Sequence, residues 1–143
     1  MTGAVVAGAV LLAATVFGLV RRWRDGRLRD VPVTKGAAVR ETLAAGDLGA
    51  ELGERATLVQ FSTAFCAPCR ATRRVLGEVA GMVGGVVHVE IDAEHRLDLV
   101  RRLDVLRTPT VLVLDPSGRV VRRAAGQPRK ADVIAALAEA IPE

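Results

Sequence analysis

Aromatic residues and cysteines are both scarce in this chain of 143 residues. It holds three Phe, one Trp and no Tyr, so aromatic residues make up only 3% of a sequence that is 50% hydrophobic. A core must therefore be built mainly from Val, Leu, Ile and Ala. Two cysteines are too few for the disulfide framework of a small secreted protein. This length predicts one compact domain.

Negative charge is not lacking overall, but positive charge is concentrated in one place. Residues 21–30 contain five Arg and two Asp, whereas residues 31–143 contain fifteen basic and fourteen acidic side chains. A basic face interleaved with aromatic residues is also missing. These patterns argue against nucleic acid as a partner.

Charged side chains are absent from residues 1–20, and the run from Ala4 to Val20 is apolar apart from Gly and Thr15. A helix of this length spans about 30 Å, the thickness of the hydrocarbon core of a bilayer. Trp23 would then lie at the depth of the headgroups. A buried helix of a soluble protein is the alternative, but nothing else in the sequence requires a helix that is apolar on all sides.

The order of charges distinguishes an anchor from a cleaved signal peptide. A signal peptide carries its basic residues before the apolar run, but here the arginines follow Val20 and no A-x-A cleavage site is evident. We therefore expect an uncleaved single-pass anchor, with the arginines and all later residues on the cytoplasmic side. The predicted organisation is a transmembrane helix and basic juxtamembrane segment in residues 1–30, and one domain in residues 31–143.

The two cysteines, Cys66 and Cys69, lie two residues apart in a setting typical of redox chemistry. An apolar run, 57–61, predicts a buried strand, and the pattern after Cys66 predicts a helix over 67–82. On the first helical turn the two sulfurs can form a disulfide. The free N–H groups and dipole of the helix favour a thiolate there. Strand, turn, Cys-x-x-Cys and helix together indicate a thiol redox site.

Alternating patterns along the rest of the chain predict an α/β fold. Strands separated by helices favour parallel pairing, and a final hairpin adds an antiparallel strand, so we expect a mixed sheet with helices on both faces. The predicted elements are a strand near Val39, a helix beginning near Asp47, a strand over 86–91, a helix over 92–103, a strand over 110–114 with Val120-Val121 as its hairpin partner, and a helix over 130–141. The residues predicted to face inward are Val75, Leu76, Val79, Ala80, Met82, Val87, Val89, Ile91, Leu97, Val100, Leu103, Val133, Ile134, Leu137 and Ile141.

Three motifs in residues 37–143 resemble the thioredoxin family. The run Phe65-Cys66-Ala67-Pro68-Cys69 is similar to the family's aromatic-Cys-x-Pro-Cys active site. Thr108-Pro109-Thr110 resembles its Thr-Pro loop, in which the proline is cis and faces the cysteines, and Gly126 resembles a glycine near the same site. The resemblance implies a thioredoxin-like fold behind a transmembrane helix, and a thiol–disulfide oxidoreductase.

Each motif residue has an expected role. We expect Cys66, the more exposed sulfur, to attack a substrate disulfide and Cys69 to resolve the mixed disulfide. Pro68 lies in the first turn, where a missing N–H costs little, and Phe65 supplies an apolar platform in place of the family's usual Trp. A cis bond would turn the backbone of Thr108 toward the cysteines, where a substrate peptide can pair with it.

Two positions depart from the family pattern. The family often has a buried Asp six residues before the first cysteine and a Lys on the next strand, where this chain has Gln60 and His88. Gln60 cannot take a proton from Cys69. His88 could act as a base or through water, although a strand histidine with no catalytic task is the simpler interpretation.

Three arginines follow the cysteines on the same predicted helix, namely Arg70, Arg73 and Arg74. Near a helix N-terminus they oppose the helix dipole. They could help to hold a thiolate, or they could form an ordinary solvated basic face.

The sequence therefore predicts a membrane-anchored reductase or thiol relay, because the cytoplasm is reducing. Its expected partners are protein disulfides and a thiol donor or acceptor of electrons, with no cofactor beyond the Cys66–Cys69 disulfide, and the chain is expected to be a monomer. One alternative is a non-catalytic binding module of the same fold. Another is a zinc site formed by both cysteines with His88 and His95, although their spacing does not fit a zinc finger.

Overall fold

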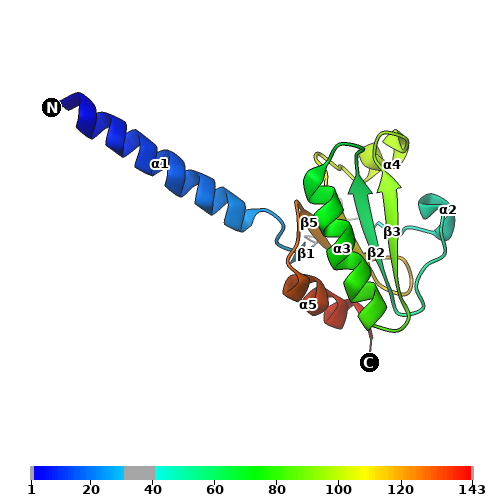
Figure 1. Ribbon diagram of the computed structural model, residues 1–143. Helices are drawn as coiled ribbons and strands as arrows, with labels where there is room; N and C mark the ends of the chain where they lie inside the picture. The colour runs from blue at the N-terminus through cyan, green and yellow to red at the C-terminus, as the bar shows by residue number, and fades with distance from the viewer. Residues whose placement is uncertain (1, 31–40, 143) are drawn as a thin grey trace, which may run out of the picture.

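The computed structural model describes residues 2–30 and 41–142, and shows a long helix that extends away from an α/β domain (Figure 1). Helices cover both faces of a central sheet. The elements in chain order are α1 (Thr2–Arg24), β1 (Arg29–Asp30), α2 (Ala45–Leu48), β2 (Ala56–Ser62), α3 (Ala67–Met82), β3 (Val86–Asp92), α4 (Leu97–Arg102), β4 (Thr110–Leu114), β5 (Val120–Ala125) and α5 (Lys130–Ala140).

The sheet is mixed, with the strand order β1-β5-β4-β2-β3. Strand β2 is parallel to β3 but antiparallel to β4, and β5 is antiparallel to both β4 and β1. The prediction that only the final hairpin is antiparallel is therefore wrong. The six residues of α4 span about 9 Å, whereas a seven-residue strand spans about 23 Å. The chain therefore enters β4 at the same end of the sheet at which β3 finishes, and β4 runs back beside β2 in the opposite direction.

Strand β2 lies at the centre of the domain, and all seven of its residues are buried. Its alternate side chains enter two separate cores, one on each face of the sheet. Val59 and Phe61 pack with residues of α2, α4 and β4, whereas Leu58 packs with α3, α5 and β4. Figure 1 shows α3 and α5 in front of the sheet. Burial on both faces explains why apolar residues occur at both odd and even positions of β2 instead of alternating with polar ones.

Several residues predicted to face inward are exposed. Met82, Val87, Leu97 and Ile134 have exposed fractions of 64%, 38%, 51% and 41%. Val87 lies on β3, an edge strand with one side open. The predicted helix over 92–103 begins only at Leu97, because the Asp92 carboxylate accepts the Glu94 N–H and holds a turn there. The other inward predictions hold at least in part: the buried ones are Leu76, Val79, Val89, Ile91, Leu103, Val133 and Leu137, and the half-buried ones are Val75, Ala80, Val100 and Ile141.

Near the start of the domain the outcome is mixed. The predicted strand near Val39 lies outside the described residues. The helix expected near Asp47 is α2, a single turn in which the Asp47 carboxylate accepts the N–H of Ala44 at 2.9 Å. The basic juxtamembrane segment predicted within residues 1–30 holds the end of α1 and strand β1. Because β1 pairs with β5, the segment after α1 is joined to the edge of the sheet.

Helix α1 has the properties expected of a membrane span. Among the described residues, Gly3–Arg24 is the one helix long and apolar enough to cross a bilayer, with a mean hydropathy of 2.3. Its side chains from Gly3 onward make no buried core with the domain. A signal sequence can also form an apolar helix of this kind near the N-terminus.

Candidate active site

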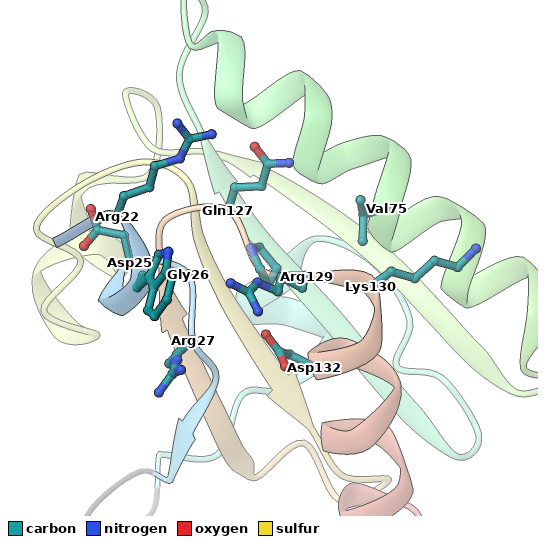
Figure 2. A pocket seen from close by; sticks show the side chains of 11 residues that line it. Arg22, Asp25, Gly26, Arg27, Val75, Gln127, Arg129, Lys130 and Asp132 are labelled. Atoms are coloured by element: carbon teal, nitrogen blue, oxygen red, sulfur yellow. The ribbon is translucent and has the colours of Figure 1, made fainter. Parts of the chain in front are cut away.

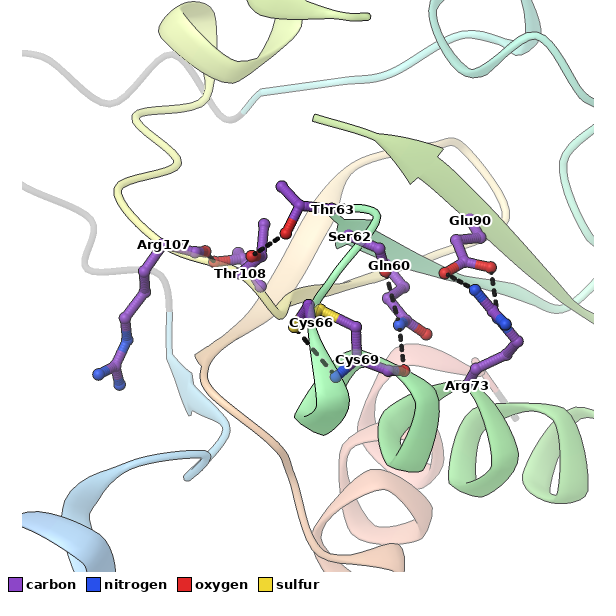
Figure 3. Close-up of a disulfide and its surroundings, with 10 residues drawn as sticks. Gln60, Ser62, Thr63, Cys66, Cys69, Arg73, Glu90, Arg107 and Thr108 are labelled. Carbon is purple, nitrogen blue, oxygen red and sulfur yellow. Dashed lines mark hydrogen bonds and ion pairs between the residues drawn. A yellow bond between two sulfur atoms is a disulfide. The ribbon is translucent and has the colours of Figure 1, made fainter. Parts of the chain in front are cut away.

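The two cysteines lie where β2 gives way to α3, and they form a disulfide with an S–S distance of 2.07 Å and a Cα–Cα distance of 5.2 Å. Cys66 is the N-cap of α3, and its Sγ accepts the backbone N–H of Cys69 at 3.2 Å (Figure 3). Pro68 stands in the first turn, where its missing N–H leaves no helical carbonyl without a donor. The predicted helix over 67–82 is confirmed to the residue.

The two sulfurs differ in environment. Cys69 is buried, with an exposed fraction of 1%, whereas Cys66 is partly exposed. The aromatic ring before them, Phe65, is fully exposed to solvent. An incoming disulfide can therefore approach Cys66, and the surface around it is apolar.

The Thr108-Pro109 loop closes the site from the other side. Its peptide bond is cis, as the resemblance implies. The hydroxyl oxygens of Thr108 and Thr63 lie 3.1 Å apart, which joins this loop to the turn before Cys66 (Figure 3). The N–H of Gly126 donates to the carbonyl of Pro109 at 2.7 Å, and Gly126 has a φ of +100°, a conformation that suits glycine. The structure thus brings the predicted residues of three separate segments together.

Gln60 and His88 form a polar connection beneath Cys69. The buried Gln60 amide donates from Nε2 to the carbonyl of Cys69 and to the hydroxyl of Ser62, both at 2.8 Å. Its Oε1 lies 3.2 Å from Nε2 of His88. Since an amide oxygen only accepts, His88 donates here. His88 therefore reaches Cys69 through Gln60, and burial lowers its pKa by disfavouring the charged ring.

The arginines of α3 do not surround the sulfurs. Arg73 forms a two-pronged ion pair with Glu90, at 2.6 and 2.8 Å, and this pairing lowers the pKa of Glu90 (Figure 3). Arg70 and Arg74 are exposed. The simpler interpretation, a solvated basic face, fits Arg70 and Arg74, whereas Arg73 is held by Glu90.

Sequence reasoning missed the contact between the end of α1 and the active-site loops. Arg107, directly before Thr108, binds the Asp25 carboxylate at 2.8 Å and the carbonyl of Ala125 at 2.7 Å. The N–H of Gly26 donates to the same carbonyl at 2.9 Å. The only signal in the sequence was the Asp25-Gly26 pair, a common turn dipeptide that does not identify its partner.

The four residues of the zinc alternative are not gathered into one site. His88 bonds to Gln60, and Nδ1 of His95 lies 2.8 Å from the Asp92 carboxylate. Within the described segments, no three His, Cys, Asp or Glu side chains are grouped so as to hold a metal ion.

The model of the thioredoxin family matches residues 42–139. The chain belongs to the thioredoxin family. Thioredoxin from Gallus gallus is 34% identical over 67 residues, which are 45% of this chain and 64% of that protein. Thioredoxin from Mycobacterium tuberculosis is 27% identical over 109 residues, covering 76% of this chain and 93% of that protein.

Solved thioredoxins share the fold. A mutant thioredoxin from Halobacterium salinarum superposes with a TM-score of 0.57 at 18% identity, over 63% of this chain and 78% of its own. A thioredoxin from Nicotiana alata gives 0.56 at 24% identity, over 62% and 76%. With the family known, the Cys66–Cys69 pair is a thiol–disulfide oxidoreductase site of the thioredoxin type.

Proposed function

We propose that this member of the thioredoxin family is a membrane-anchored oxidoreductase that reduces protein disulfides, or relays electrons between thiols, at the cytoplasmic face of a membrane. The observation that supports this most is the asymmetric pair at the start of α3, with Cys66 accessible and Cys69 buried behind it. The pair alternates between dithiol and disulfide without a bound cofactor. We expect the chain to act as a monomer.

The reaction balances within the two cysteines and the substrate. The Cys66 thiolate attacks one sulfur of the substrate disulfide, forming a mixed disulfide and releasing the other sulfur as a thiolate that takes up a proton. The Cys69 thiolate then attacks Cys66 Sγ, and the second substrate sulfur leaves and is protonated. The substrate gains two electrons and two protons, and the chain is left with the Cys66–Cys69 disulfide. A dithiol donor reverses this step by the same exchange.

The surrounding residues support binding and position. The Cys69 N–H, which donates to Cys66 Sγ, is available to stabilise the Cys66 thiolate. Phe65 directly precedes Cys66, Thr108 is joined to the turn before Cys66 through Thr63, and Gly126 holds Pro109 in place. These residues would form the surface on which a substrate strand lies. His88 acts as a positioning residue, because its contact is with Gln60 and not with a sulfur.

The membrane location draws support from α1 and from the position of its arginines. The helix has the length and hydropathy of a membrane span, and Arg21, Arg22 and Arg24 occupy its last turn. Basic residues that flank a span remain on the cytoplasmic side. In that reducing compartment the domain would donate electrons. Measuring the mass of the mature chain distinguishes the two interpretations of α1. An uncleaved anchor leaves the full mass, whereas removal of a signal sequence lowers it.

Trapping the mixed disulfide tests the activity. We expect a Cys69→Ser variant to accumulate covalent adducts with substrate proteins, because no second thiol remains to release them. The Cys66→Ser variant should form none, and both variants should lose at least ~1,000-fold of the rate of protein disulfide reduction, as expected when a nucleophile is removed.

Two outcomes of this comparison would contradict the proposed reaction. Adducts formed equally by both variants would contradict the assignment of Cys66 as the nucleophile. Full cellular function of the Cys66→Ser chain would instead support a non-catalytic binding module.

A further inference from the structure

A cavity of about 540 Å³ separates the end of α1 from the start of α5, on a part of the molecule that the redox chemistry does not use. Figure 2 shows basic side chains from separate segments around it: Arg22 from α1, Arg27 from the turn that follows, and Arg129 with Lys130 at the start of α5. Segments more than one hundred residues apart in the sequence thus contribute positive charge to one space.

The charges around this cavity do not cancel. Two carboxylates also line it, Asp25 and Asp132, and Asp25 is bound to Arg107 outside the cavity. Lys130 in turn is paired with Glu78 at 2.9 Å. Among the described residues, the four cations that line the cavity and Arg107 are set against the two lining carboxylates and Glu78, an excess of two positive charges. This excess attracts an anion, and a bound anion with a single negative charge would still leave the cavity with a net positive charge.

The backbone of α5 adds donors on the same side. Its N-cap, Arg129, makes no side-chain cap hydrogen bond, so the first N–H groups of this 11-residue helix are not satisfied by a cap. Such N–H groups and the helix dipole favour an oxyanion, phosphate above all. This donor set supplements the basic side chains that define the cavity.

The position of the cavity favours a lipid as the source of the anion. Arg22 and Trp23 line it and belong to the last turns of α1, directly after the uncharged residues 1–20. If α1 spans the bilayer, as the proposed function holds, these two residues lie at headgroup depth. We infer that the cavity binds the phosphate of an anionic phospholipid headgroup, and so holds the domain against the membrane surface.

The inferred site adjoins the redox site. The Asp25-Gly26 turn lines the cavity on one side, and on the other side it binds Arg107 and Ala125 next to the Thr108-Pro109 loop. A bound headgroup would therefore fix the orientation of the substrate-binding edge relative to the bilayer. The substrates favoured by this arrangement are proteins whose disulfides lie close to the membrane surface.

Trp23 makes the inference testable, because it is the only tryptophan in the chain and it lines the cavity. The full chain would be placed in nanodiscs of phosphatidylcholine, with or without phosphatidylglycerol. We expect phosphatidylglycerol to change the Trp23 fluorescence and to be retained in native mass spectra. The double variant Arg27→Gln and Arg129→Gln should weaken this retention about 25-fold, since each cation near an anionic surface contributes about fivefold.

Matched variants control for net charge and folding. Arg55→Gln with Arg101→Gln removes two exposed arginines elsewhere and should bind like the wild type. Lys in place of Arg27 and Arg129 keeps the charges and should preserve most of the retention. Equal loss in both Gln pairs would overturn the site, since only overall charge would then matter.

Two further arms separate the possible failures. Inorganic phosphate, added to phosphatidylcholine nanodiscs, should leave Trp23 unchanged. If it produces the whole fluorescence change and phosphatidylglycerol adds nothing, the lipid assignment is wrong. Insertion without any preference for phosphatidylglycerol overturns this inference alone, whereas failure of the chain to enter the nanodiscs also overturns the membrane anchor of the proposed function.

Discussion

At the scale of the residue, the chemistry depends on what lies beneath Cys69. Gln60 occupies a position where many thioredoxins carry a carboxylate, and its amide binds the Cys69 carbonyl and Ser62 while accepting from His88. An amide in this place holds the geometry without carrying charge. The cost of burying it is offset because all of these contacts are hydrogen bonds.

His88 should make stability depend on pH. Burial lowers its folded-state pKa below the usual 6.5, so the unfolded chain binds more protons as pH falls through that value. We expect the free energy of unfolding to decrease from about pH 8 to about pH 5.5, and His88→Gln to remove this part of the slope. Urea unfolding of both chains across this range provides the measurement.

The pH range of this measurement, from about 8 to about 5.5, excludes a contribution from Glu90. Arg73 holds the pKa of Glu90 below its usual 4.5, so this carboxylate titrates below the range. A His88→Gln chain with the full wild-type slope would show that another group is responsible.

At the scale of the element, the end of α1 is attached to the domain through backbone contacts. Strand β1 pairs with β5, and the turn before it donates from Gly26 to Ala125. Gly26 is buried there with a φ of +79°, and a Cβ on it would lie 1.8 Å from the carbonyl oxygen of Gln127. No other residue type fits this close approach without a shift of the backbone.

Gly26→Ala should therefore weaken the attachment of α1 to the sheet. We expect a loss of about 1–3 kcal/mol from left-handed strain and steric conflict. Chemical unfolding of the detergent-solubilised full chain would measure it. Gly18→Ala on α1, where a Cβ has nothing within 4 Å, is the matched control and should not destabilise the chain. Equal stability of the two variants would mean that the turn is not held as the structure shows.

At the scale of the whole molecule, charge and topology are linked. Arginines occupy the last turn of the apolar helix α1, and the turn after α1 joins this helix to the active-site loop through Asp25 and Arg107. If α1 spans a membrane, as proposed, these arginines set its orientation, and that orientation determines the compartment in which Cys66 reacts.

Moving the basic residues from the C-terminal to the N-terminal end of α1 should invert the orientation of the chain in the membrane. In a Cys69→Ser background, Cys66 of the original chain should resist a membrane-impermeant thiol reagent in intact cells and react after lysis. A charge-swapped chain should react in intact cells, because the basic residues nearest the span now precede it. The swap consists of Thr2→Lys and Gly3→Lys together with Gln in place of Arg21, Arg22, Arg24, Arg27 and Arg29. Lys in place of the same five arginines is the control that keeps the orientation. Labelling of the unswapped chain in intact cells would contradict the cytoplasmic assignment.

Local patterns were sufficient for much of the fold and for the cysteines. The strand over 110–114 and the helix over 67–82 match the structure in both bounds, because each has a clear periodicity and a turn or cap at its ends. The Cys66–Cys69 pair and the Thr108-Pro109 loop were recognisable as short motifs. Leu97 and Ile134 were misplaced, since a helix of one to three turns offers too few positions to define which side meets the sheet.

The sequence by itself determined the redox pair, the apolar helix and the asymmetry of charge around it, because each lies within a few consecutive residues. Only the tertiary structure decided that β4 runs antiparallel to β2, that His88 reaches Cys69 through Gln60, and that the end of α1 contacts the active-site loops. These features join residues far apart in the chain. Which distant residues meet depends on how both faces of β2 are packed, and no local pattern contains that information.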